Sequence, residues 1–442
     1  MVQSCTALRC APLALALLPA VARADTAAPA SLQSFAIHAQ STFVLQGVPD
    51  FRSPYAGTNS LIPGQRKETF DATLYVGVSP WKGMEIWANP EIDQGFGLSN
   101  TLGVAGYVSG EAYKVGKKHP YVRLQRLFLR QTIDLGGDQQ AVDAAANQLG
   151  GHHSANRIVL TIGKISTGDI FDTNKYAHDP RGDFLNWSVI DSGSFDYAAE
   201  AWGYTYGVAA EWYQGPWAFR FGALNLSKVP NGTTLESDFS QYQLVGEIEH
   251  RHQIGGRDGA LRVTAFRSSG RFGTFADALS LARATGTTPD TSAVQQQRSR
   301  AGVDVNLEQA VTDTIGVFAR GGLADGSVAP YDFTDIDRSV SAGASINGKS
   351  WGRDDDTIGI AGVVNGISSS HRRYFAAGGL GVLVGDGQLK HYGPEEIAEA
   401  YYSFKPAKPL AITLDYQFIA HPGYNRDRGP ANVIGVRLHG QF

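Results

Sequence analysis

Hydrophobic and polar residues alternate with a period of two along most of the chain. Between residues 66 and 79, apolar side chains occupy every second position and polar side chains occupy the positions between them. Successive side chains of a β-strand point to opposite faces, so this alternation predicts strands with one apolar and one polar face. The same pattern recurs at 84–95, 203–214, 241–252, 410–419 and 433–442.

The connections between the predicted strands alternate between short turns and long loops. Short turns occur at 79–83, 214–216, 353–356 and 406–408, whereas 136–156 is longer than a turn requires. The long loops are predicted at 48–65, 96–120, 167–202, 228–240, 274–297, 327–336, 369–394 and 423–431. Short turns at one end and long loops at the other are typical of bacterial outer-membrane barrels. We therefore predict an all-β fold, a transmembrane antiparallel β-barrel of about 16 strands around an aqueous channel.

Composition agrees with a barrel that crosses the membrane. No stretch after residue 24 approaches the roughly 20 consecutive apolar residues of a transmembrane helix, and the mean hydropathy is only −0.19. Strands in which only every second residue meets lipid account for this mildly polar average. Aromatic residues near the inferred turns predict an interfacial belt, and these are Trp81, Trp212, Tyr213, Trp217, Tyr401 and Tyr402.

The amino terminus resembles a secretory signal peptide. Residues 1–24 combine a basic Arg9, an apolar run at 11–21 and a small-residue cleavage site at 22–24. A buried amino-terminal helix is the alternative interpretation. Cleavage would leave 25–442 as a single outer-membrane barrel domain without cysteine, because Cys5 and Cys10 lie in the removed segment. A net charge of −4 gives no indication of a nucleic-acid partner.

Charged residues on two neighbouring strands are candidates for the pore lining. The strand at 84–95 places Trp87, Asn89, Glu91 and Asp93 on one face, and the next strand carries Arg123, Arg126 and Arg130. The alternation slips near Gln125, which predicts a β-bulge. Arginine on the lipid face costs about 2–4 kcal/mol at the midplane, so we place all three in the lumen. Either they pair with acidic wall residues or they contact solute, and the sequence leaves both open.

The loop at 167–202 is a candidate constriction. It contains many large aromatic and acidic residues, namely Phe171, Asp172, Phe184, Trp187, Asp191, Phe195, Asp196 and Trp202. Surface loops rarely carry so many large aromatic residues without burying them, so we predict that this loop folds inward and narrows the barrel. Aromatic planes flanked by polar groups suit sugars, which have flat C–H faces and a rim of hydroxyls. The alternative is a loop that only packs on the wall.

Signals for catalysis and for metal binding are weak. His152 and His153, and likewise His250 and His252, have no companion ligands at the spacing of a metal site. The segment 192–194 lacks the strand–turn–helix context of a hydrolase nucleophile. The sequence therefore predicts a channel that is not an enzyme and that needs no cofactor or metal.

Several separated motifs resemble those of the carbohydrate-selective porin family of Gram-negative bacteria, the OprB type. These motifs are NPEIDQGFGLSNTLGVAGYVSGEAYKVG at 89–116, RLFLRQTIDLGG at 126–137, GKISTGDIFDTNKYAHDPRGDFLNW at 163–187 and EAYYSF at 399–404. The resemblance implies a 16-stranded porin for monosaccharides, glucose above all, with a constriction lined by arginine, acidic and aromatic side chains. It transfers that role to Glu91, Asp93, Arg123, Arg126 and Trp187, and it assigns none to 274–297.

The expected function is passive, gradient-driven diffusion of glucose-like monosaccharides into the periplasm through a water-filled pore narrowed by 167–202. A general ion-passing porin, and an outer-membrane adhesin or scaffold that uses its long loops, stay open as alternatives. The expected partners are monosaccharide solutes, outer-membrane lipid and the β-barrel assembly machinery, which would recognise the terminal strand ending in Phe442 by strand addition. A homo-oligomer is compatible with the sequence.

Overall fold

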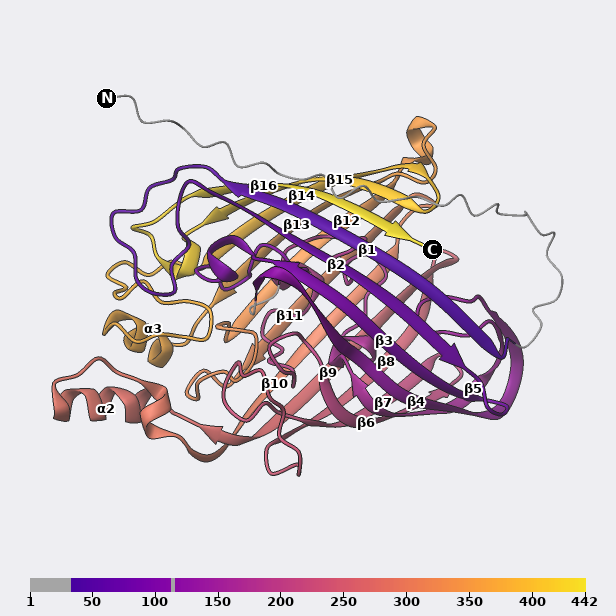
Figure 1. The fold of residues 1–442 in the computed structure, drawn as a ribbon, viewed down its shortest axis with the longest axis horizontal. Coiled ribbons are helices and arrows are strands. Elements are labelled where there is room, and N and C mark those ends of the chain that lie inside the picture. The colour runs from indigo at the N-terminus through magenta and orange to yellow at the C-terminus, as the bar shows by residue number, and fades with distance from the viewer. Residues whose placement is uncertain (1–32, 113–115) are drawn as a thin grey trace.

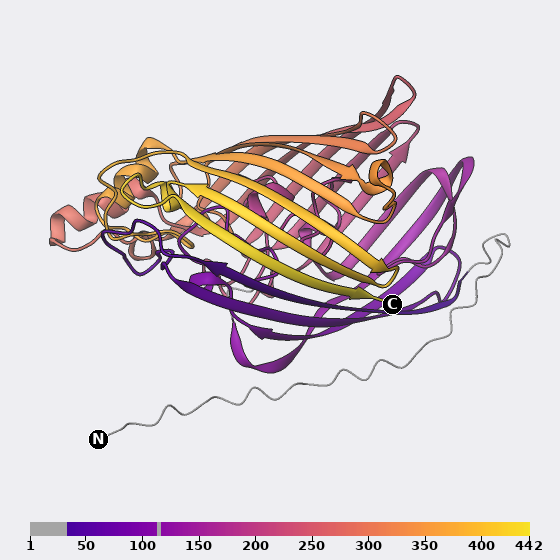
Figure 2. The ribbon, with the colours of Figure 1, turned by 90° about the horizontal axis from the view of Figure 1, so that it is seen from above.

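The computed structural model describes residues 33–112 and 116–442, in which sixteen antiparallel strands close into a barrel (Figures 1 and 2). Every strand pairs with its sequence neighbours, and β1 (Phe35–Val48) pairs with β16 (Ala431–Gln441) to close the ring. The other strands are β2 Gln65–Val78, β3 Met84–Gly95, β4 Lys117–Val142, β5 Gly151–Ile165, β6 Thr205–Gln214, β7 Trp217–Asn225, β8 Tyr242–Ile254, β9 Arg257–Phe272, β10 Gln296–Ala310, β11 Ile315–Ala324, β12 Arg338–Asn347, β13 Thr357–Gly366, β14 Glu395–Ala407 and β15 Leu410–Ala420. The predicted architecture is confirmed, whereas the predicted signal peptide lies outside the described residues.

The barrel carries its apolar side chains on the outside and its polar side chains within. In β15, Leu414 is 60% exposed whereas its neighbour Asp415 is 3% exposed. In β16, Ile434 is 57% exposed and Arg437 is 1% exposed. This arrangement suits a lipid surround, because the apolar face meets the hydrocarbon and the lumen holds the polar groups.

The predicted aromatic belt is right for some residues and wrong for others. Trp81, Trp212 and Trp217 are exposed on the outside. Tyr401, however, points inward and is 3% exposed, and its ring occupies the space beside Gly359 on β13. A Cβ at Gly359 would lie 2.1 Å from that ring. Position parity along the strand, rather than closeness to a turn, decides which face a residue occupies.

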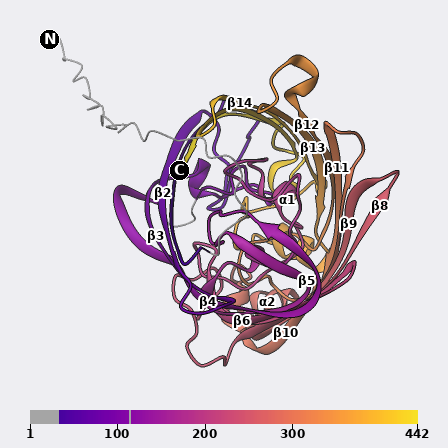
Figure 3. The same cartoon turned by 90° about the vertical axis from the view of Figure 1, so that its right-hand side faces the viewer.

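The helices all belong to the connections. The α-helices are α1 Trp187–Ile190, α2 Phe275–Thr285 and α3 Ser369–Ala376, and the 3-10 helices are η1 Leu98–Asn100, η2 Thr167–Asp169, η3 Thr291–Val294, η4 Gly348–Trp351 and η5 Pro422–Tyr424. Helices α2 and α3 lie at the end that carries the long loops (Figure 1), whereas α1 lies inside the ring of strands (Figure 3). Within the described part of the chain, no helix has the length and apolar character needed to span a bilayer.

One connection differs from the expectation. The segment 136–156 reads as a long connection, but β4 continues to Val142 and β5 begins at Gly151, so only residues 143–150 join them. The pairing register shifts on either side of Gly136, which has a φ of 94°. Because these irregularities interrupt the period of two, the strand pattern is lost in the sequence although the strands continue.

Candidate functional site

The loop between β5 and β6, residues 166–204, folds into the lumen and is called the constriction loop below. The backbone N–H of Asp172 donates to Glu247 Oε2 on β8 at 2.7 Å. The Asp172 carboxylate accepts hydrogen bonds from Asn306 Nδ2 on β10 and from the backbone N–H of Ser192, each at 2.6 Å. Phe171, which precedes it, is fully buried. The inward fold predicted for this loop is therefore observed.

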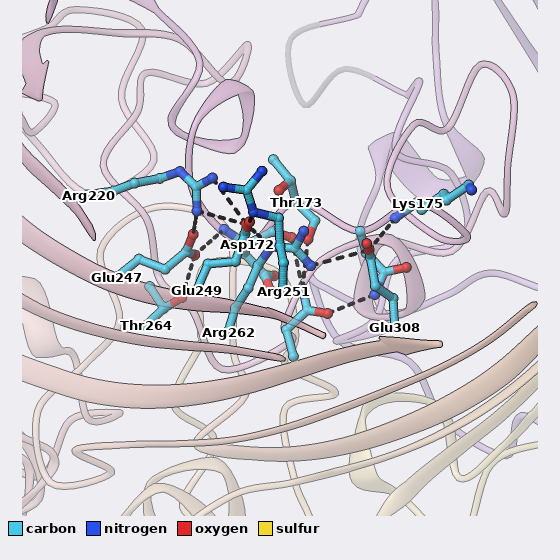
Figure 4. Close-up of polar contacts among 12 residues, drawn as sticks. Asp172, Thr173, Lys175, Arg220, Glu247, Glu249, Arg251, Arg262, Thr264 and Glu308 are labelled. Carbon is cyan, nitrogen blue, oxygen red and sulfur yellow. Dashed lines mark hydrogen bonds and ion pairs between the residues drawn. The ribbon is translucent and has the colours of Figure 1, made fainter. Parts of the chain in front are cut away.

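A charged network on the wall supports this contact (Figure 4). Arg220 on β7 donates to Glu247 at 2.7 Å and to Glu249 at 3.1 Å. Arg262 on β9 donates to Glu249 Oε2 at 2.9 Å. The buried carboxylates on the wall that the constriction loop contacts are thus paired with guanidinium groups, as buried charges require.

On the other side of the barrel, wall carboxylates bind the loop backbone directly. Glu399 on β14 accepts a hydrogen bond from the N–H of Asn186 at 3.1 Å. Glu395, at the start of β14 and on the same face, accepts from the N–H groups of Ala105 at 3.0 Å and Gly106 at 2.8 Å in the β3–β4 loop. These contacts hold the backbone of the constriction loop and of the β3–β4 loop against β14. The cavity described below lies on the side of β2 and β4, where Tyr75 and Arg126 line it.

The acidic row predicted on β3 does face the lumen. Trp87, Asn89, Glu91 and Asp93 are all at most 1% exposed. Glu91 contacts Arg181 Nη2 at 3.1 Å and accepts from Gln125 Nε2 at 3.0 Å. The Trp87 indole N–H donates to Glu85 Oε2 at 2.7 Å. These side chains form the wall behind the passage, and none of the four lines the cavity described below.

The three predicted arginines also point inward, and each has a partner. Asn89 pairs with Arg126 but Pro90 pairs with Leu124, which confirms the bulge predicted at Gln125. The individual contacts are Arg123 with Glu200 at 2.9 Å, Arg126 Nε with Asp169 Oδ2 at 2.7 Å, and Arg130 Nη1 with the Asn147 carbonyl oxygen at 2.7 Å. The guanidinium of Arg123 also lies 3.5 Å from the centre of the Trp202 ring. Arg123 and Arg126 thus pair with the constriction loop, and Arg126 and Arg130 also line the cavities of the lumen.

A cavity of about 320 Å³ lies between the constriction loop, the β3–β4 loop and the wall formed by β2 and β4. Its lining combines aromatic rings with charged groups, namely Tyr75, Tyr107, Glu111, Arg126, Asp169, His178, Asp179, Arg181, Trp187, Asp191, Tyr197, Trp202 and Tyr204. Trp187 stacks on Tyr107 with ring centres 5.3 Å apart and is 1% exposed. Trp187 thus mainly supports the Tyr107 ring and exposes little of its own ring to the cavity.

Arg181 is the residue that sequence reasoning missed. Its guanidinium reaches from the constriction loop to three carboxylates, Asp71 at 3.2 Å, Glu91 at 3.1 Å and Glu111 at 3.2 Å. Burial raises the pKa of Glu111 well above its usual range, and Arg181 opposes that shift. The available signal was that Arg181 is the single arginine in an acidic loop, but a loop has no period that tells which way a side chain points.

Asp191 adds a titratable group to the cavity. Burial raises the pKa of Asp191 to about 6, and His178 opposes the shift. The His178 Nδ1 atom lies 3.7 Å from the carboxylate. The charge of the cavity therefore depends on pH in the weakly acidic range.

A family model described as "Carbohydrate-selective porin, OprB family" matches residues 58–442, most of the chain. The chain belongs to the OprB family. It is a carbohydrate-selective porin of the outer membrane, and the family resemblance seen in the motifs is confirmed. The family and the fold are those of a channel.

Solved structures agree on the fold of this OprB-family porin. The high-pH structure of Pseudomonas putida OprB matches with a TM-score of 0.71 and 16% identity, over 92% of this chain and 94% of that chain. The low-pH structure of the same protein matches with a TM-score of 0.50 and 12% identity, over 92% and 93% of the two chains. The outer membrane channel DcaP of Acinetobacter baumannii gives 0.53 and 11%, over 96% and 100%. No curated protein sequence matches significantly.

Proposed function

We propose that this OprB-family porin passes monosaccharides of the glucose type into the periplasm by passive, gradient-driven diffusion. The observation that carries the proposal is the cavity beside the constriction loop, where aromatic rings and paired charges line one narrow space. Its volume of about 320 Å³ suits a solute of one or a few sugar rings rather than a folded chain. Solute passes between the loop and the wall of β2 and β4.

The chemistry of the lining fits a sugar. The C–H face of a pyranose packs against rings such as Tyr107 and Tyr204, while its hydroxyls donate to Asp179 and Asp191 and accept from Arg126. The arginines keep their carboxylate partners whether or not a sugar is bound. Each hydrogen bond to the sugar therefore replaces a hydrogen bond to water, and its net free energy is small. Binding therefore stays weak enough for release, which net flux through a channel requires.

Swelling of proteoliposomes tests this proposal. Vesicles containing the purified porin are placed in isosmotic D-glucose, and a trisaccharide and potassium chloride serve as comparison solutes. We expect glucose to enter faster than the trisaccharide at a rate proportional to the gradient. Salt entry without glucose entry would support a general ion-passing porin instead, and the absence of any swelling would support an adhesin or scaffold.

A further inference from the structure

A second cavity follows the first toward the end of the barrel that carries the short turns. It has a volume of about 350 Å³ and is lined by wall residues of β3 to β6. Ala146, Asn147 and Asp169 line both cavities. The two cavities therefore adjoin at these residues, and a solute that leaves the constriction on this side enters the second cavity.

The boundary between the cavities is the tight turn at 143–150. Ala145 and Gln148 exchange both backbone hydrogen bonds, each at 3.0 Å. Asn147 lies between them at a φ of 59°, a left-handed conformation that asparagine tolerates better than most residues. Arg130 Nη1 donates to the Asn147 carbonyl oxygen at 2.7 Å. The turn is consequently held against the wall of the lumen, with its tip in the passage.

The second cavity is lined by polar and aromatic side chains, among them Arg157 and Tyr213. Arg157 Nε and Asn147 Oδ1 are buried, and neither has a hydrogen-bond partner among the described residues. The Arg157 guanidinium lies 3.9 Å from the centre of the Tyr213 ring, and the Tyr213 hydroxyl donates to Glu211 Oε2 at 2.6 Å. The Arg157 guanidinium and the Tyr213 ring both line the cavity, and a cationic donor beside an aromatic ring matches a polyol, whose hydroxyls accept and whose C–H groups pack on rings.

We propose that this second cavity is a sugar-binding site in series with the constriction cavity, and that Asn147 separates the two. This inference rests on the proposed sugar transport. In series, each site needs to bind only weakly, because a solute leaves the first site by entering the second rather than by crossing open water. Arg157 contributes a hydrogen-bond donor to the second site. The Asn147 side chain lies between the two sites, and the sugar must move past it to pass from one to the other.

One-sided sugar block of single channels tests the proposal. Arg157→Met removes the guanidinium donors at similar side-chain length, and Arg251→Met is the matched control. Arg251 also lies near the Tyr213 ring, at 5.7 Å, but it lines a different cavity. With D-glucose on the periplasmic side, we expect Arg157→Met to weaken block by about threefold to tenfold, and Arg251→Met to leave it within error of the wild type. Equal effects of the two substitutions would overturn the proposal.

A second variant tests the role of the turn. Asn147→Gly keeps the left-handed backbone conformation without strain and removes the side chain between the cavities. Two sites in series predict two relaxation times in the sugar-induced current noise of the wild type, which merge into one in Asn147→Gly. A single relaxation time in the wild type would contradict two sites. Absence of any sugar block in the wild type would instead contradict the proposed function itself.

Discussion

At the scale of single residues, the lumen pairs charges that come from different parts of the chain. The cost of an arginine that faces lipid, together with the bulge predicted at Gln125, places Arg123 and Arg126 in the lumen. The sequence does not predict their partners, Glu200 and Asp169. Both partners lie in the constriction loop, where no period shows direction. The facing of wall residues is therefore predictable from sequence, whereas the ion pairs that shape the passage are not.

Removal of one guanidinium and one ring from the constriction should weaken sugar binding. In the double variant Arg126→Ala and Trp187→Ala, the cavity loses a hydrogen-bond donor and the support of the Tyr107 ring. We expect the affinity of glucose block to fall about tenfold. The matched control is Arg267→Ala with Trp217→Ala, because both residues are exposed on the strands. Sugar block that is unchanged in the first variant would remove Arg126 and Trp187 from the site.

The raised pKa of Asp191 predicts a change of ion selectivity with pH. Asp191 in the docked loop binds its proton more tightly than a free carboxyl does. The free energy that Asp191 contributes to docking of the loop is therefore fully present below the usual pKa of a carboxyl and is lost as the pH rises through about 6. Above that pH the cavity gains a negative charge. We expect the reversal potential in a salt gradient to shift toward cations between pH 5 and pH 7, a range that spans about one unit on either side of this pKa.

Two variants assign the titration. Asp191→Asn removes the carboxyl with little change in shape, and it should flatten the pH dependence of the reversal potential. His178→Gln keeps Asp191 and removes the imidazole 3.7 Å away. A pH-dependent shift that survives in Asp191→Asn and disappears in His178→Gln would show that the imidazole, rather than the carboxyl, carries the titration.

At the scale of elements, connections carry most of what is specific to this porin. The positions of the long loops followed from the sequence, because polar stretches interrupt the alternation. The path of the constriction loop did not, since it depends on contacts such as Asp172 with Glu247. The β4–β5 connection was misjudged because register shifts near Gly136 hide strands that continue. Loop placement is thus visible in the sequence, and loop conformation is not.

Arg181 should hold the constriction loop against the wall through its ion pairs. Arg181→Gln leaves Asp71, Glu91 and Glu111 without their shared cation, and removal of one member of a buried ion pair is strongly destabilising. We expect a larger single-channel conductance, a stronger preference for cations and weaker sugar block. Arg283→Gln on the exposed face of α2 is the control for charge alone. Identical conductance in Arg181→Gln and the wild type would show that Arg181 does not hold the loop in place.

At the scale of the whole molecule, the barrel has an apolar outer surface around a polar interior. This inversion is predictable because most charged residues in the middle of the strands keep to one parity. Ile248, at the centre of β8, is 48% exposed on the face assigned to lipid. Ile248→Arg should reduce the free energy of unfolding from lipid vesicles by about 2–4 kcal/mol, as measured by urea titration.

Val311→Arg provides the comparison for that substitution. Val311 is 49% exposed, but it lies in the turn between β10 and β11 and outside the strands. We expect Val311→Arg to change the free energy of unfolding by less than about 0.5 kcal/mol, as ordinary surface substitutions do. Equal costs at the two positions would contradict the assignment of the β8 outer face to the bilayer core.

Sugar transport through this porin requires that a sugar occupy the ion-conducting passage beside the constriction loop. Planar-bilayer recording of the purified porin tests it most directly, with glucose added in increasing concentration at constant salt. We expect an open-channel current that glucose reduces in a saturable manner, with weaker block in the Arg126→Ala and Trp187→Ala variant. A current that glucose leaves unchanged would show that no sugar occupies the passage.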